Sequence, residues 1–145
     1  MSRTADLGFD AAVLDKENQA VALIQVKSHS VENWESALEG QLGSIPERVT
    51  FVLTIDPNLI LLHKVANAKL GQPIVELDTK QVLQNYDATY SKTRVFESYL
   101  LTLVEAWLRD LAYHWKSENP PGSEELGKTG LLEKLEGGTT QPLGA

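Results

Sequence analysis

Two short apolar segments separated by a polar turn constrain the fold of this chain more than any other feature. Residues 11–14 are apolar throughout, and residues 21–26 are apolar except for Gln25. The five residues that follow Leu14, Asp-Lys-Glu-Asn-Gln, have the composition of a turn, so we expect a β-hairpin. Pairing would bring Asp10, just before the first strand, close to the Gln25 end of the second strand. The sequence therefore predicts that polar side chains gather at one edge of an apolar sheet.

The arrangement of these polar residues resembles the PD-(D/E)XK nuclease superfamily, which has the restriction endonuclease-like fold. The signature of that family is an acid at the start of one strand, followed by a (D/E)-x-K triplet on the next strand. On this match, Asp10 corresponds to the first acid, Gln25 to the second acid and Lys27 to the lysine. The resemblance spans roughly residues 10–60. It implies a metal-dependent nuclease in which Asp10 and Gln25 ligate Mg²⁺ and Lys27 positions the attacking water.

Gln25 departs from the family pattern and weakens the expected metal site. A neutral amide oxygen can ligate a hard cation, but it brings no charge, and magnesium sites depend on carboxylates. We therefore expect lower metal affinity, with catalysis slow or absent. An acid on the segment that follows could compensate, and Glu35 is preferred over Glu32 and Glu39. An ordinary hairpin with solvated ends would also carry an acid and a lysine at these positions.

Two hypotheses for function remain open on this pattern. The first is Mg²⁺-dependent phosphodiester hydrolysis of nucleic acid by a nuclease-like domain with a weakened metal site. The second is a catalytically inactive nuclease-like domain that acts as a protein-interaction or regulatory module. The net charge of −7 disfavours nucleic acid as a partner, because a polyanion normally binds a basic surface. Retention of Asp10 and Lys27 favours the first hypothesis, and Gln25 favours the second.

Composition indicates one compact domain and is compatible with a reducing compartment. At 145 residues the chain has the size of a single domain, and 42% hydrophobic residues are enough for a core. It has no cysteine, which excludes disulfides and thiolate zinc sites. Neither a signal peptide nor an apolar run of bilayer length is visible, so we expect a cytoplasmic protein without membrane contact.

Beyond the hairpin, helix and strand patterns alternate, which predicts an α/β fold: a restriction endonuclease-like mixed sheet flanked by helices. The strongest helix pattern, residues 93–115, has apolar side chains at three-and-four spacing and should pack on the sheet. The expected elements are a helix over 31–42, strands over 48–55 and 59–65, a loop over 66–73, a short strand over 74–77 and a helix over 79–86.

Both ends of the chain differ from what this fold leads us to expect. The superfamily core usually begins with a helix and a first strand, yet nine residues precede Asp10, so these two elements are expected to be missing. An uncovered strand favours association, and we expect a homodimer or a partner that supplies the edge. We assign the nuclease-like domain to residues 1–116. Residues 117–145 are rich in proline, glycine and acids, which predicts a disordered acidic tail.

Three further polar residues are weaker candidates. Gln41 matches a glutamine that some relatives carry on the helix facing the site, although a polar helix-end residue is the commoner reading. His63 lies on an apolar strand without a partner acid nearby in sequence, which is typical of a structural histidine. His29 follows Lys27 by two residues and could reach a substrate phosphate, but a loop histidine is more often solvated.

Overall fold

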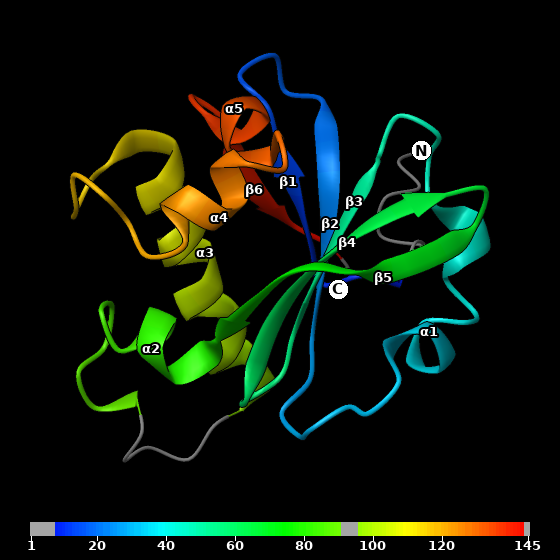
Figure 1. Ribbon diagram of the computed structural model, residues 1–145, viewed down its shortest axis with the longest axis horizontal. Helices are drawn as coiled ribbons and strands as arrows, with labels where there is room; N and C mark the ends of the chain where they lie inside the picture. Colours follow the sequence, from blue (N-terminus) through cyan, green and yellow to red (C-terminus); the bar gives the residue numbers. More distant parts are fainter. Residues whose placement is uncertain (1–7, 91–95, 144–145) are drawn as a thin grey trace.

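The computed structural model describes residues 8–90 and 96–143, which form a six-stranded mixed sheet with helices on both faces (Figure 1). The strands lie in the order β5-β4-β3-β2-β1-β6. Among these strands β2 and β3 are parallel, and every other neighbouring pair is antiparallel. The expected mixed sheet flanked by helices is therefore confirmed. The strands are β1 (Ala11–Leu14), β2 (Ala20–Val26), β3 (Phe51–Ile55), β4 (Leu59–Ala66), β5 (Lys69–Asp78) and β6 (Thr139–Pro142).

The β1–β2 hairpin forms as the sequence predicts. Ala11 pairs with Ile24 and Val13 with Ala22, so Asp10 lies opposite the end of β2. The turn is held by the Asp15 carboxylate, which accepts hydrogen bonds from the backbone N–H groups of Glu17 and Gln19, both at 2.9 Å. An aspartate that caps its own turn in this way fixes the hairpin register.

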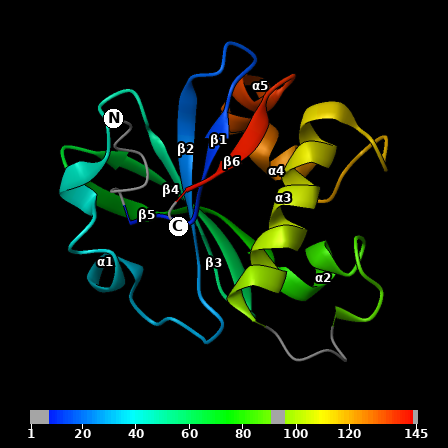
Figure 2. The same cartoon turned by 180° about the vertical axis from the view of Figure 1, so that it is seen from behind.

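The helices fall into two unequal layers. On one face α3 (Glu97–Tyr113) packs on the sheet together with α2 and the two short helices near the C-terminus (Figures 1 and 2). The other face carries only α1 (Trp34–Ala37) and the 3₁₀ helix η2 (Leu42–Ser44). The remaining helices are α2 (Thr79–Leu83), α4 (Ser123–Gly127) and α5 (Leu131–Leu135). Each face of the sheet therefore has its own apolar core.

The predicted helix over 31–42 is wrong, because the segment is broken into two short pieces. The N–H of Val31 donates to the carboxylate of Asp56 at 3.0 Å, which ties this residue to the β3–β4 turn instead of a helix. The Asn33 side chain then caps α1 by accepting from the N–H of Ser36 at 3.1 Å. Gly40 and Gly43 follow, and glycine disfavours a continued helix.

The predicted loop over 66–73 is also wrong. It is a hairpin turn and the first half of β5, which is ten residues long and lies at the edge of the sheet. Asn67 and Ala68 both have positive φ, 53° and 61°, as a tight two-residue hairpin turn requires. Pro73 lies where the β4–β5 register is irregular, and an edge strand tolerates proline there.

The predicted disordered tail is folded from residue 117 to residue 143, so the boundary at 116 is not a domain boundary. Leu126, Leu131 and Leu135 are at most 1% exposed and belong to the core beneath α3. The helices α4 and α5 bury these leucines, and their apolar contacts outweigh the glycine- and acid-rich composition. The last strand, β6, then pairs antiparallel with β1, with Ala11 opposite Pro142. The edge of β1 is therefore covered from within the same chain (Figure 2).

Candidate functional site

Asp10 lies at the point where β1, β2 and β6 meet. Its N–H donates to the carbonyl of Ile24 at 2.9 Å, and its carboxylate Oδ2 accepts from the N–H of Val26 at 2.8 Å. On the other side its carbonyl accepts from the N–H of Leu143 at 2.9 Å. These three bonds fix both the backbone and the carboxylate of Asp10. The second carboxylate oxygen, Oδ1, accepts no hydrogen bond from any described residue.

Gln25 is 5% exposed and faces a second glutamine. Its Oε1 accepts a hydrogen bond from Nε2 of Gln41 at 3.3 Å, and the same Nε2 donates to the carbonyl of Gly8 at 2.7 Å. Gln41 is the residue just before η2, and its side chain makes no cap hydrogen bond to that helix. Gln41 is therefore part of the site, whereas the sequence favoured a plain helix-end role.

Lys27 follows β2 directly and continues the parallel pairing with β3. Its N–H donates to the carbonyl of Ile55 at 2.9 Å. Because side chains alternate along a strand, Gln25 and Lys27 lie on the same face as Leu23, the face covered by α1. Lys27 has no ion pair with any described residue. The structure therefore brings Asp10, Gln25 and Lys27 to one end of the β1–β2 hairpin, as predicted.

The electrostatic environment of Asp10 involves one residue that the sequence did not single out. Burial raises the pKa of the Asp10 carboxyl, and the hydrogen bond from Val26 opposes that effect. The charge of Glu97 raises the pKa further, and the charge of Lys27 lowers it. Glu97 is the first residue of α3, far from the hairpin in sequence. On its helix it belongs to the polar side, so no local signal distinguished it.

The other candidates lie elsewhere. Glu35 and Glu32 line a separate cavity of about 320 Å³ that also includes His63. His63 is buried, with Nε2 3.0 Å from Oγ1 of Thr54 and Nδ1 2.9 Å from the carbonyl of Gly71. Burial lowers its pKa, so this imidazole is a neutral, hydrogen-bonded core residue. His29 is exposed.

The donor set at Asp10 suits a weak metal site rather than a closed one. The described residues contain no group of three His, Asp or Glu side chains able to enclose a metal ion. Magnesium, however, keeps several waters and is often held by one or two carboxylates together with substrate phosphates. Asp10 offers one such carboxylate through Oδ1, Oε1 of Gln25 adds a neutral oxygen, and the charge of Glu97 acts on Asp10. Such a site would need the substrate to complete it.

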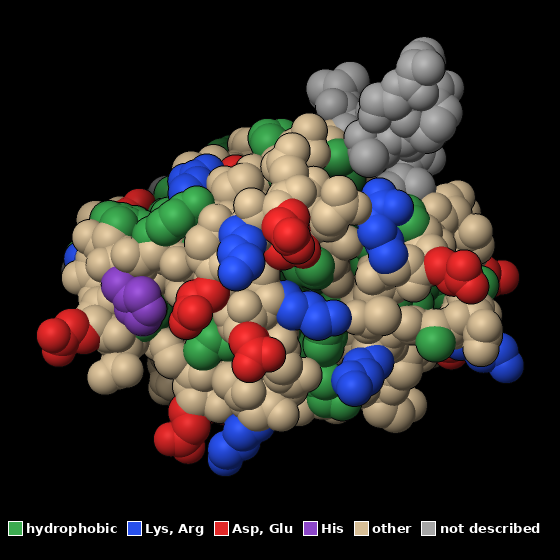
Figure 3. Space-filling model, turned by 90° about the horizontal axis from the view of Figure 1, so that it is seen from above, with side chains coloured by type: hydrophobic (Ala, Val, Ile, Leu, Met, Phe, Trp, Pro, Cys, Tyr) green, Lys and Arg blue, Asp and Glu red, His purple; other side chains and the backbone are tan. Residues whose placement is uncertain are grey.

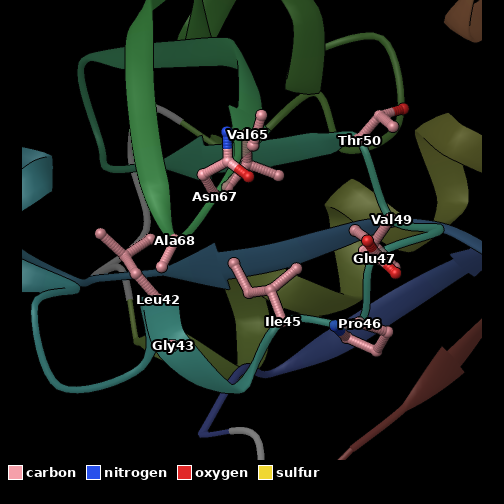
Figure 4. Close-up of a pocket in the computed structure, with 11 residues that line it drawn as sticks. Leu42, Gly43, Ile45, Pro46, Glu47, Val49, Thr50, Val65, Asn67 and Ala68 are labelled. Carbon is pink, nitrogen blue, oxygen red and sulfur yellow. The ribbon is translucent and has the colours of Figure 1, made fainter.

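A further cavity on the molecule has few side chains that could bind or react with a ligand. The cavity in Figure 4 has a volume of about 220 Å³ and lies between η2 and the β4–β5 turn. Its lining is mostly apolar, and Glu47 is the sole titratable residue among the described residues that form it. It contains none of the predicted site residues.

Comparisons with protein families, curated proteins and solved structures gave no match for this chain. Within residues 8–90 and 96–143, none of the helices has the length and apolarity needed to cross a bilayer.

Proposed function

We propose that this chain is a PD-(D/E)XK nuclease-like domain that hydrolyses phosphodiester bonds in nucleic acid with the aid of Mg²⁺, at a weakened metal site. The observation that carries the proposal is the convergence of Asp10, Gln25 and Lys27 at one end of the β1–β2 hairpin. The three positions that resemble the family motif therefore lie at the same end of the hairpin, which supports the proposal.

The chain topology adds support. The family resemblance implies a helix and a strand ahead of the acid-bearing strand, and these were expected to be missing. In this chain β6 pairs with β1 antiparallel, and α3 packs on the sheet close to β6. We infer that β6 takes the place of the first strand and α3 that of the first helix, although both follow β1–β5 in sequence and α4 and α5 lie between them. The parallel β2–β3 pair also agrees with the family order of strand, helical segment and strand.

The residues of the site have separate roles in this proposal. Asp10 Oδ1 and Gln25 Oε1 would hold the metal, and Gln41 would orient the Gln25 amide through its hydrogen bond. Bound Mg²⁺ lowers the pKa of a water ligand and neutralises charge on the phosphate. Lys27 has no described carboxylate partner, so its ammonium group is free to orient the attacking water and contact the phosphate.

A second candidate function is an inactive nuclease-like domain that serves as a protein-interaction or regulatory module. The observation that favours it is the glutamine pair, because Oε1 of Gln25 already accepts from Gln41 and would have to exchange that bond for the metal. The raised pKa of Asp10 also makes its carboxylate less ready to carry the charge that a metal requires. The net charge of −7 acts in the same direction by repelling nucleic acid.

Metal titration separates the two functions. Mn²⁺ and Mg²⁺ are titrated calorimetrically into the wild type, Asp10→Ala and Gln25→Glu, and plasmid nicking is assayed in parallel. We expect weak binding that Asp10→Ala abolishes and that Gln25→Glu strengthens about tenfold or more, through the added carboxylate. Glu35→Gln is the matched control, since it removes one charge from the separate cavity and should change nothing.

Metal-dependent nicking that is lost in Asp10→Ala and Lys27→Met would establish the nuclease function. Flat titrations for the wild type together with restored binding in Gln25→Glu would instead favour the inactive module with an intact pocket. Flat titrations for every variant, with circular dichroism showing folded protein, would overturn the metal site altogether.

A further inference from the structure

Two lysines converge on one buried phenylalanine at the end of the sheet opposite Asp10 and Lys27. Lys64 of β4 is the cross-strand partner of Phe51, the first residue of β3. Its Nζ lies 6.0 Å from the centroid of the Phe51 ring, and Nζ of Lys134 on α5 lies 5.9 Å from the same centroid. A strand and a helix far apart in sequence thus place two ammonium groups around one ring.

These lysines border a cavity of about 360 Å³. The other described residues that line it are uncharged: Thr50, Phe51, Val65, Ala66 and Thr129. The described lining therefore carries two positive charges and no carboxylate, in a chain whose net charge is −7. Neither lysine forms an ion pair with a described residue. Two unneutralised cations facing one hollow favour an anion over any other ligand.

Packing accounts for only part of this arrangement. Lysine stems cover apolar surface while their charged ends stay in water, and Phe51 is accordingly only 3% exposed. Contact with the ring face also stabilises an ammonium group, by about 0.5–1 kcal/mol at exposed sites. Covering the Phe51 ring, however, does not explain why no Asp or Glu is among the described residues that line the adjoining cavity. The neighbouring cavity, which shares Lys64 and Thr129, is lined by Glu76 and Glu125 as well as Lys128. The cavity at Lys134 therefore differs from its surroundings in charge.

We propose that the cavity between Lys64 and Lys134 binds a small phosphorylated ligand, whose phosphate group lies between the two ammonium groups. Charge-assisted hydrogen bonds from lysine to phosphate oxygens would provide the affinity. The size of the cavity and the mixed charges around it favour a compact ligand over a nucleic acid strand. On the end of the molecule shown in Figure 3, lysine and arginine side chains lie close together, but aspartate and glutamate side chains are interspersed with them. An extended polyanion would meet these carboxylates.

This site is independent of the proposed nuclease site. Phe51 is the first residue of β3, whereas Ile55, the backbone partner of Lys27, is the last. The two sites also lie on different faces, because Phe51 packs with the core beneath α3 and Gln25 lies on the face of α1. One phosphate cannot contact both.

Pyrophosphate is the probe that tests the proposal. It is titrated into the full chain by calorimetry and thermal shift, with sodium chloride of equal ionic strength as the reference. We expect saturable binding to the wild type and affinity at least about tenfold weaker in Lys64→Met and in Lys134→Met, since each loses one charge-assisted contact. Methionine keeps an apolar stem over Phe51, so both variants should unfold at nearly the wild-type temperature without ligand. Lys69→Met, an exposed position on β5, is the matched control and should bind as the wild type does.

Two results would overturn the proposal. One is pyrophosphate binding that is equal in the wild type, Lys64→Met and Lys134→Met, or absent from all of them. The other is a lysine-dependent response to a short single-stranded DNA but not to pyrophosphate, because it would assign the lysines to nucleic acid.

Discussion

Asp10 holds a carboxylate in a half-buried position where its charged form is disfavoured. Burial is the largest cause of its raised pKa, and the hydrogen bond from Val26 does not cancel it. A carboxyl with a raised folded-state pKa contributes stability that is fully present below its unfolded value of 3.8 and is lost as pH rises through the folded value. At neutral pH the fold therefore carries a destabilising charge at the candidate site, which is common where chemistry requires a charge.

The raised pKa of Asp10 predicts how Asp10→Asn changes the stability of the fold. The amide can still accept the hydrogen bond from Val26 but has no charge, so at neutral pH the variant should unfold at a higher temperature, by a few degrees or on that order. The difference should shrink as pH falls toward 3.8, where the wild-type carboxyl is itself protonated. Thermal unfolding across this pH range is the measurement, with the exposed Glu39→Gln as the control for net charge. A lower unfolding temperature for Asp10→Asn at neutral pH would contradict the argument.

Asp110 is a buried acid whose pKa is shifted in the opposite direction to that of Asp10. It is fully buried within α3, and burial alone would raise its pKa. The hydroxyl of Tyr86 donates to it at 2.7 Å, and the N–H groups of Lys116 and Ser117 donate at 2.8 and 3.0 Å, so its pKa is lowered overall. Asp110 thus joins the end of α3 to Tyr86, just after α2, and to Lys116 and Ser117, just after α3 itself. A helical pattern does not reveal these partners, because all three lie outside α3.

We expect Asp110→Ala to lower the free energy of unfolding by about 3 kcal/mol, because three partly buried hydrogen bonds lose their acceptor. Asp110→Asn keeps an acceptor oxygen and should lose about 1 kcal/mol. The stability that the lowered pKa provides is present above the unfolded value of 3.8 and is lost as pH falls through the folded value. Urea unfolding of the three proteins at neutral and acid pH measures both effects. Equal losses in the two variants at neutral pH would show that the hydrogen bonds are not the cause.

At the scale of elements, the sequence predicted what local patterns determine and missed what distant contacts determine. The β1–β2 hairpin, the buried strand β3, its antiparallel partner β4 and the long helix α3 all follow from apolar periodicity. The helix over 31–42 failed because Asp56, more than twenty residues away, takes the N–H of Val31. The site shows the same division. Asp10, Gln25 and Lys27 come from one hairpin, so their proximity was predicted, whereas Glu97 acts on Asp10 only through the packing of α3.

The folding of residues 117–143 is the clearest case of tertiary contacts overriding composition. Three leucines at the core and a four-residue strand fix a segment whose glycines and acids otherwise predict disorder. Gly138 leads into that strand, and a Cβ there would lie against the carbonyl oxygen of Leu14, 2.9 Å from its carbonyl carbon. The close approach of two backbones is what requires glycine at this position.

Gly138→Ala should therefore weaken the attachment of β6 to β1. The obstacle is backbone, which cannot move aside as a flexible side chain could, so we expect a loss of about 2–4 kcal/mol in the free energy of unfolding. Hydrogen exchange of the β1 amides, residues 11–14, should accelerate as well. Gly40→Ala is the matched control, because a Cβ there meets nothing within 4 Å, and it should be neutral or stabilising by up to about 1 kcal/mol. Unchanged exchange in β1 would argue against this role of Gly138.

At the scale of the whole molecule, the first and last described strands lie side by side. The N–H of Leu143 donates to the carbonyl of Asp10, and β6 runs antiparallel to β1. The end of β6 is therefore next to the start of β1, as in a hairpin whose turn is absent. If the chain were closed into a ring, its elements would follow in the order α3, α4, α5, β6, β1, β2, and β6 and β1 would become consecutive antiparallel strands. Elements that are far apart in sequence, such as β1 and β6, are thus neighbours in the sheet.

A circular permutant tests this view of the molecule. Residue 143 is joined to Gly8 by a linker of about four residues, a usual length for a hairpin connection, and the chain is opened within residues 91–95. The cut interrupts no described helix or strand, so we expect cooperative unfolding, a wild-type circular dichroism spectrum and an unchanged metal titration. A second permutant, joined in the same way but opened in the β3–β4 turn at Pro57, is the control. There Asp56 accepts from the N–H groups of Asn58 and Leu59, and the cut would break the hairpin, so this permutant should be much less stable. If the first permutant failed to fold while the second folded, the pairing of β6 with β1 would not be the contact that closes the sheet.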